Sequence, residues 1–190
     1  MDIRCFIAIE ITEEIKNDLG QLIDILMKFD ADVKWVVPEN LHITLKFLGN
    51  TPPALVPRIR ESLERLLTSY KPFYIRICGT GVFPSKKKPR VIWVGVMNLD
   101  SLNKLKKDME ESMALLGYQK EDREFNPHLT LGRVRSPRGI LNILGELDRF
   151  KEKDFGTIYV ESIKLMRSEL RHGGAQYSCL YDISFNTTIS

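Results

Sequence analysis

Two short segments of the sequence repeat a pattern that could move protons. Residues 42–45 read His-Ile-Thr-Leu and residues 128–131 read His-Leu-Thr-Leu, and together they hold two of the three histidines. Imidazole has an ordinary pKa of about 6.5, so near neutral pH one ring can accept a proton while another donates one. Such a pair suits in-line attack at phosphorus, with hydroxyl groups binding the non-bridging oxygens. The doubled motif predicts this chemistry for His42, Thr44, His128 and Thr130.

The same residue types also have structural explanations. A single histidine on a half-apolar strand is usually a core or surface residue, and threonine is common in strands. Two matched contexts favour a functional interpretation of His42 and His128 over that alternative. His172 stands outside the pattern, in the segment Arg-His-Gly-Gly of an expected hairpin turn, and is interpreted as a bystander. Two histidines without a third ligand are too few for a zinc site, so neither a metal nor a cofactor is expected.

Both motifs fall in segments that read as strands, where side chains alternate between two faces. Alternation places His42 and Thr44 on one face, and Ile43, Leu45 and Phe47 on the other. Each half of the chain reads strand, helix, motif strand, helix, strand, and the two histidines are 86 positions apart (128 − 42). Internal duplication then predicts one bilobal α+β domain over residues 1–190, with approximate halves 1–88 and 89–190. We expect two pseudo-symmetric antiparallel sheets, each backed by helices, and an active-site cleft between the lobes.

Periodicity and turn residues define the individual elements. In the first half we expect strands at 4–11, 41–48 and 73–78, helices at 12–30 and 54–69, a cap at Thr12, and a turn at Gly49-Asn50. In the second half we expect strands at 90–96, 128–134, 157–166 and 176–185, a helix capped by Ser101, and a short helix from Ser136-Pro137 to about 147.

Composition is that of a soluble globular protein. Of the 190 residues, 43% are hydrophobic and 28% charged, and no run of 18 apolar residues suggests a membrane span. The first residues lack the features of a secretory signal, so we expect a cytoplasmic protein. A formal charge of +3 permits an anionic partner without demanding one. Nothing suggests an obligate protein partner, and a monomer is expected.

The context of the motifs resembles that of a known enzyme family. At these residues the chain resembles the two-histidine (2H) phosphoesterases, and more narrowly the LigT-like RNA 2',3'-cyclic phosphodiesterases, also called 2'-5' RNA ligases. The resemblance covers nearly the whole chain. Besides the motifs it includes residues 4–9 (RCFIAI), 35–41 (WVVPENL), 46–49 (KFLG), 81–84 (GVFP), 89–95 (PRVIWVG), 125–127 (FNP) and 168–170 (SEL).

This resemblance implies metal-independent hydrolysis of RNA or nucleoside 2',3'-cyclic phosphate to a 2'-phosphate. It implies that His42 is the proton donor to the departing 3'-oxygen and that His128 is the proton acceptor from water, while Thr44 and Thr130 hold the phosphoryl oxygens. RNA ends or cyclic nucleotides would be the substrates. Two alternatives stay open, namely a 2'-5' RNA ligase acting on tRNA-half-like ends and a non-catalytic module that binds RNA or nucleotide phosphate.

Further residues are candidates for substrate binding. Arg133 matches a family arginine near the phosphate or nucleotide, but strict alternation places it opposite His128 unless the strand bulges at Gly132. Arg90 ends the basic run 86–90, which could contact an RNA backbone or simply be solvated. The aromatic side chains that could stack on a base, or instead belong to the core, are Phe47, Trp93 and Phe125.

Overall fold

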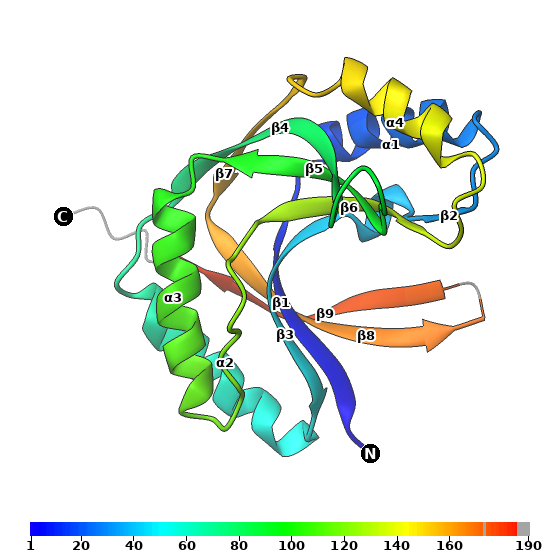
Figure 1. Ribbon diagram of the computed structural model, residues 1–190. Helices are drawn as coiled ribbons and strands as arrows, with labels where there is room; N and C mark the ends of the chain where they lie inside the picture. Colours follow the sequence, from blue (N-terminus) through cyan, green and yellow to red (C-terminus); the bar gives the residue numbers. More distant parts are fainter. Residues whose placement is uncertain (173, 186–190) are drawn as a thin grey trace.

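The computed structural model describes residues 1–172 and 174–185 and contains the expected mixture of strands and helices (Figure 1). The helices are α1 (Glu13–Met27), α2 (Val56–Leu67), α3 (Asp100–Ala114) and α4 (Ile140–Arg149), with short 3-10 turns η1 (Pro38–Asn40) and η2 (Pro53–Leu55). The strands are β1 (Ile3–Glu10), β2 (Val33–Trp35), β3 (His42–Thr51), β4 (Phe73–Phe83), β5 (Val91–Met97), β6 (His128–Val134), β7 (Asp154–Val160), β8 (Ser162–Arg171) and β9 (Gly174–Ser184).

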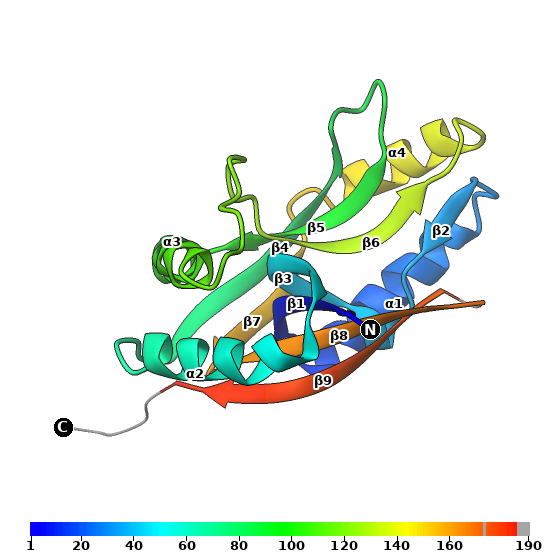
Figure 2. The same cartoon turned by 90° about the horizontal axis from the view of Figure 1, so that it is seen from below.

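The strands form one curled antiparallel sheet, so the predicted α+β class is confirmed. The strand order is β7-β4-β5-β6-β3-β1-β8-β9, and β2 pairs with β6. The expectation of two separate sheets is corrected, because β3 and β6 hydrogen-bond to each other. Their ladder consists of a single paired position, Ile43 opposite Leu129. The two strands diverge on either side of it, and Figure 2 shows the separation.

The two sides of this junction each combine segments from both halves of the sequence. Strand β4 comes from the first half of the chain but lies between β5 and β7. Strand β8 comes from the second half but lies between β1 and β9. The motif strands β3 and β6 therefore lie at the centre of the sheet, flanked by β1 and β5, and each of these flanking strands pairs in turn with a strand from the other half.

The helices form where apolar residues recur at helical spacing. Helix α1 buries Ile15, Leu19, Leu22, Ile23 and Leu26 on one face. It begins as predicted, because the Ile15 backbone N–H donates to the Thr12 hydroxyl oxygen at 3.4 Å. Helix α2 packs on α3 and β9, while α1 contacts β7 and α4 contacts β4, so the two pairs cover different ends of the sheet (Figure 1).

Several predicted boundaries are wrong for local reasons. Ser101 lies inside α3, whose preceding residue Leu99 makes no side-chain capping bond. Helix α4 starts later than predicted, after Gly139, which has φ 71°. A Cβ at Gly139 would lie 2.8 Å from the Ala31 Cα, so close backbone approach sets this start. The long strand predicted at 157–166 is divided into β7 and β8 at Glu161.

Within the described ranges, no helix combines the length and the apolar character that a membrane crossing requires.

Candidate active site

A cleft of about 1080 Å³ opens where β3 and β6 diverge. Its lining includes His42 and Thr44 from β3, and His128 and Thr130 from β6. The structure therefore brings together all four residues of the doubled motif, although its two copies lie 86 positions apart in sequence.

The pairing of Ile43 with Leu129 sets the relative positions of these side chains. Because the strands are antiparallel, continuing this register by one residue places His42 across from Thr130, and Thr44 across from His128. Ile43 and Leu129 point to the other face and are fully buried, at 0% exposure each. Each histidine is thus accompanied by the threonine of the other motif, and the core beneath the junction holds the arrangement.

Both imidazole rings are oriented in the same way. The Nδ1 atom of His42 lies 2.7 Å from the backbone carbonyl oxygen of Asn40, and that of His128 lies 2.7 Å from the carbonyl oxygen of Asn126. A carbonyl oxygen can only accept, so Nδ1 carries the proton and Nε2 is left to exchange protons in the cleft. The Asn40 side chain also donates to the Ala175 carbonyl at 2.9 Å. Sequence reasoning missed this feature, although the doubled pattern Asn-x-His was there to find.

The two rings differ in their surroundings. His42 lies between Phe6 and Tyr177, with ring centroids 4.9 and 5.2 Å away. Burial lowers the pKa of His42 below its ordinary value, and the hydrogen bond to the Asn40 carbonyl opposes that shift only in part. His42 is therefore neutral at pH 7 in the free protein. Among the described residues, His128 pairs with the aromatic ring of Phe83, edge to face at 5.1 Å.

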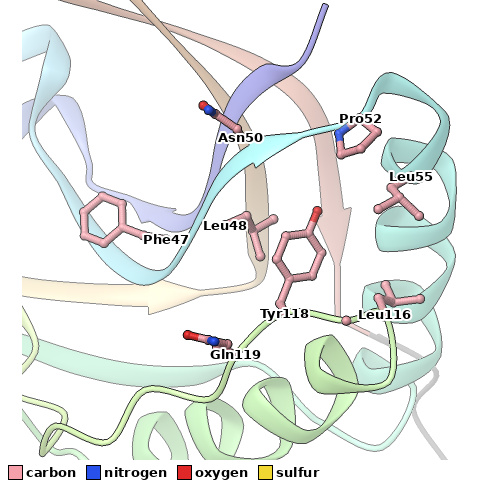
Figure 3. Close-up of a pocket in the computed structure, with 9 residues that line it drawn as sticks. Phe47, Leu48, Asn50, Pro52, Leu55, Leu116, Tyr118 and Gln119 are labelled. Carbon is pink, nitrogen blue, oxygen red and sulfur yellow. The ribbon is translucent and has the colours of Figure 1, made fainter.

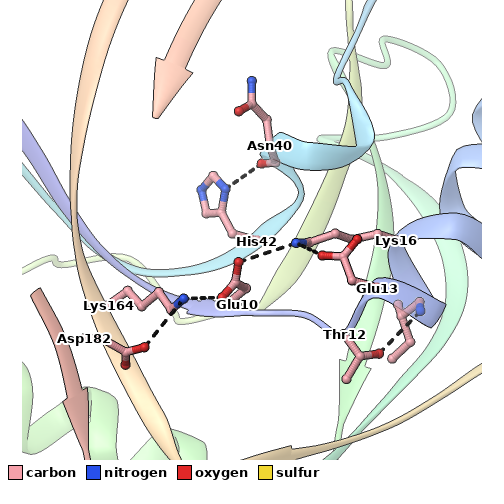
Figure 4. Close-up of polar contacts among 9 residues, drawn as sticks. Glu10, Thr12, Glu13, Lys16, Asn40, His42, Lys164 and Asp182 are labelled. Carbon is pink, nitrogen blue, oxygen red and sulfur yellow. Dashed lines mark hydrogen bonds and ion pairs between the residues drawn. The ribbon is translucent and has the colours of Figure 1, made fainter. Parts of the chain in front are cut away.

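A carboxylate lies opposite His42 in the sheet but pairs with two lysines. Glu10 is opposite His42 in the β1–β3 ladder, and Figure 4 shows its carboxylate between Lys164 and Lys16. The hydrogen bond from Lys164 is the main cause of the lowered pKa of Glu10, and Lys16 lies 3.4 Å away. These two ammonium groups balance the charge of Glu10, and a backbone carbonyl rather than a carboxylate orients His42.

A bulge in β3 changes the predicted alternation. Ala8 lies opposite Thr44 and Ile7 opposite Lys46, so Leu45 is an extra residue in β3. Beyond it the faces exchange, which turns Phe47 toward the cleft and Lys46 toward the interior. The prediction that Phe47 lies on the face opposite His42 is therefore wrong. Phe47 is 59% exposed and lines the cleft.

The second motif strand bulges at the equivalent position. Trp93 lies opposite Thr130 and Ile92 opposite Gly132, which makes Leu131 the extra residue. The bulge turns Arg133 to the cleft that His128 also lines, as the candidate role of this arginine requires. The sequence predicted this bulge at Gly132, whereas the extra residue is Leu131. Gly132 instead lets β2 approach, because a Cβ there would lie 2.6 Å from Val33 Cγ1.

The remaining candidates are divided between the cleft and its surroundings. Phe125 lines the cleft, whereas Trp93 lies outside its lining and stacks on Phe83 with centroids 5.0 Å apart. Arg90 is also outside the lining; it is exposed, and its backbone N–H donates to the Phe83 carbonyl at 2.6 Å. His172 is exposed in the turn between β8 and β9.

A buried charged network holds one wall of the cleft, residues 121–126. Lys46, at 1% exposure, donates from Nζ to Glu110 Oε2 at 2.5 Å and to the Gln119 carbonyl at 2.9 Å. Lys106 pairs with Glu110 and, at 3.0 Å, with Glu121. Burial alone would raise the pKa of Glu110, but hydrogen bonds from Lys106 and Lys46 lower it below its ordinary value. The network ties the segment before His128 to β3 and α3, and sequence reasoning missed it.

No cluster of three or more His, Cys, Asp and Glu side chains suited to a metal ion occurs in residues 1–172 and 174–185.

Comparison with known protein families matches this chain to the family described as LigT like Phosphoesterase, over residues 9–93 and 95–176. A protein of Methanothermobacter thermautotrophicus named RNA 2',3'-cyclic phosphodiesterase is 36% identical, over 94% of this chain and 96% of that protein. A protein of the same name from Thermotoga maritima is 34% identical, over 96% of this chain and 95% of its own length.

Solved structures share the fold. TT0787 of Thermus thermophilus superposes with a TM-score of 0.82 at 29% identity, covering 96% of this chain and 98% of that one. The structure of Escherichia coli LigT complexed with 3'-AMP gives a TM-score of 0.71 at 23% identity, covering 98% of this chain and 100% of that one.

Proposed function

The chain belongs to the LigT-like phosphoesterase family, and from this premise we propose that it hydrolyses RNA or nucleoside 2',3'-cyclic phosphates to 2'-phosphates. The observation that carries the proposal is the matched pair of histidines. Both bind a backbone carbonyl through Nδ1 and leave Nε2 for one cleft that also contains two threonines. The relatives named RNA 2',3'-cyclic phosphodiesterase, at 36% and 34% identity, support the choice of substrate.

In the proposed reaction the cyclic phosphate lies between the two rings. His128 Nε2 takes a proton from water as the water oxygen bonds to phosphorus, and His42 donates its Nε2 proton to the 3'-oxygen as that bond breaks. The product is a 2'-phosphate and a free 3'-hydroxyl. Thr44 and Thr130 donate hydrogen bonds to the non-bridging oxygens, and the Arg133 guanidinium balances their charge. The scheme uses side chains alone and requires no metal.

The lowered pKa of His42 determines when this ring takes up its proton. In the free protein at pH 7 the ring is neutral, because burial beside Phe6 and Tyr177 disfavours the charged form. A bound phosphate anion favours the imidazolium form of a nearby ring. His42 therefore acquires the proton together with the substrate and is ready to donate it at the 3'-oxygen.

The second candidate function for the same cleft is 2'-5' RNA ligation. A 5'-hydroxyl of a second RNA would replace water as the nucleophile, and the 3'-oxygen would leave as before. Ligation stays a candidate, because His128 would take the proton of the attacking hydroxyl and His42 would protonate the 3'-oxygen, as in hydrolysis. Action as a monomer in the cytoplasm stays a prediction of the sequence.

The test uses an RNA oligonucleotide with a terminal 2',3'-cyclic phosphate in excess chelator, with 2'- and 3'-phosphate products separated. We expect only 2'-phosphate, and a loss of about 10²–10⁴-fold in rate for His42→Ala and for His128→Ala. His172→Ala is the matched control and should keep full activity. A parallel reaction also contains a second RNA with a 5'-hydroxyl, and ligation would appear there as a longer product.

A 3'-phosphate product, or full turnover by either motif variant, would overturn the mechanism. Binding without turnover by the wild-type protein would identify a phosphate-binding module instead. Loss of activity on addition of chelator would show that the reaction depends on a metal.

A further inference from the structure

A second hollow of about 430 Å³ adjoins the cleft. Its lining includes the apolar side chains Leu48, Leu55, Leu116 and Tyr118, together with the amide side chains of Asn50 and Gln119 (Figure 3). Phe47 contributes to the lining of both the hollow and the cleft. We call this hollow the side pocket.

The floor of the side pocket continues the floor of the cleft. A second bulge in β3 falls at Leu48, because Phe6 lies opposite Phe47 whereas Cys5 lies opposite Gly49. Gly49 has φ 69°, the left-handed conformation that such a bulge uses, and it is not the turn that the sequence predicted. The residues His42, Thr44, Phe47 and Asn50 therefore follow one another from the cleft to the side pocket.

One wall is also shared. The segment between α3 and β6 contributes residues 116–119 to the side pocket and residues 121–126 to the cleft. The buried Lys46, which donates to the Gln119 carbonyl, fixes this segment near the boundary of the two hollows. A chain-like ligand that enters the cleft can thus continue into the side pocket along one floor and one wall.

A cation lies beside the boundary. Arg4 is opposite Asn50 on one side of β1 and opposite Ser168 on the other, and both Arg4 and Ser168 line the cleft. Among the residues that the structure describes, Arg4 forms no ion pair, so its charge is available to a ligand. A guanidinium and a hydroxyl at this point suit the phosphodiester that joins two nucleosides.

We propose that the side pocket binds the base of the penultimate nucleotide of an RNA end, while the terminal nucleoside and its cyclic phosphate occupy the cleft. Phe47, at 59% exposure, supplies the stacking surface between the two sites, and Asn50 and Gln119 contact the base edge. Arg4 binds the connecting phosphate. This inference rests on the proposed function and narrows its substrate class to oligoribonucleotide ends.

The experiment compares kcat/KM for a nucleoside 2',3'-cyclic phosphate with kcat/KM for a dinucleotide that ends in the same group. Stacking of one base corresponds to a gain of roughly 5- to 150-fold in affinity. We therefore expect kcat/KM for the dinucleotide to exceed that for the nucleoside by a factor within that range. Phe47→Ala and Arg4→Gln should each reduce the ratio of kcat/KM for the dinucleotide to kcat/KM for the nucleoside at least fivefold. Arg58→Gln, at an exposed arginine of α2, is the matched control and should leave the ratio unchanged.

The outcomes separate this inference from the proposed function. A ratio near one for the wild-type protein, with both substrates hydrolysed, would overturn the side pocket as a nucleotide site and leave the function intact. A high ratio that neither variant lowers would place the second nucleotide elsewhere and would also overturn the proposal. If neither substrate is hydrolysed, the proposed function fails, and this inference fails with it.

Discussion

Replacing Lys46 by methionine removes one of two cations that neutralise Glu110 in the interior. The side chains of Lys46 and Glu110 are 1% and 11% exposed, and their charged atoms are 2.5 Å apart. Breaking a buried ion pair costs about 3–5 kcal/mol, because an uncompensated charge is left behind. Glu110 keeps its partner Lys106 in the variant. We therefore expect the lower end of that range, about 3 kcal/mol of unfolding free energy.

The assay is denaturant and thermal unfolding of the wild-type and Lys46→Met proteins. For a chain of this length a loss of about 3 kcal/mol lowers Tm by roughly 6–12 °C. Lys87→Met is the control, because Lys87 is exposed and its replacement should stay within about 0.5 kcal/mol of wild type. A loss below about 1 kcal/mol for Lys46→Met would refute the reasoning, since the network would then contribute no more than an exposed pair.

The pH dependence gives a second check on this network. The pKa of Glu110 is lowered in the folded protein, so between the folded and the ordinary value the unfolded chain binds more protons. The contribution of Glu110 to the free energy of unfolding is fully present above the ordinary pKa of the carboxyl group. It is lost as the pH falls through the pKa of Glu110 in the folded protein. The difference between wild type and Lys46→Met should therefore shrink in acid. In a Glu110→Gln background the cost of Lys46→Met should also be smaller.

Three other changes have expected outcomes. Tyr177→Ala admits water to His42 and raises its pKa toward the ordinary value, so the limb of the pH profile of kcat/KM that titrates with His42 should move to higher pH; a profile with no moved limb would contradict the role of His42 as the acid. Arg133→Ala should raise KM about tenfold or more through loss of a charged hydrogen bond, and an unchanged KM would remove Arg133 from the phosphate site. Gly132→Val should displace β2 and lower Tm, because even a Cβ would lie 2.9 Å from Trp35 Cε3; an unchanged Tm would contradict this packing.

The sequence predicted which face the motif residues share, because their strands alternate regularly up to the first bulge. His42, Thr44, His128 and Thr130 all precede the extra residues Leu45 and Leu131 in their strands, and all four reach the cleft. Helix α1 was also predictable, because its apolar spacing and its Thr12 cap are local features.

Features that depend on contacts distant in sequence were not predictable. The bulges reverse the faces of Phe47 and Arg133, and Leu45 and Leu131 look like ordinary strand residues in the sequence. Strict alternation would place Lys46 on the cleft face with His42 and Thr44, yet it is buried against Glu110, which is 64 positions away. The joining of all strands into one sheet likewise depends on the single pair of Ile43 with Leu129.

A leaving-group substitution tests most directly whether His42 acts as the acid and His128 as the base. The substrate is a 2',3'-cyclic phosphate whose 3'-bridging oxygen is replaced by sulfur, because a thiolate leaves without first taking up a proton. We expect His42→Ala to recover most of its loss of about 10²–10⁴-fold with this substrate, and His128→Ala to remain slow. Recovery by His128→Ala instead would exchange the two roles. Equal impairment of both variants on the sulfur substrate would contradict the acid–base pair.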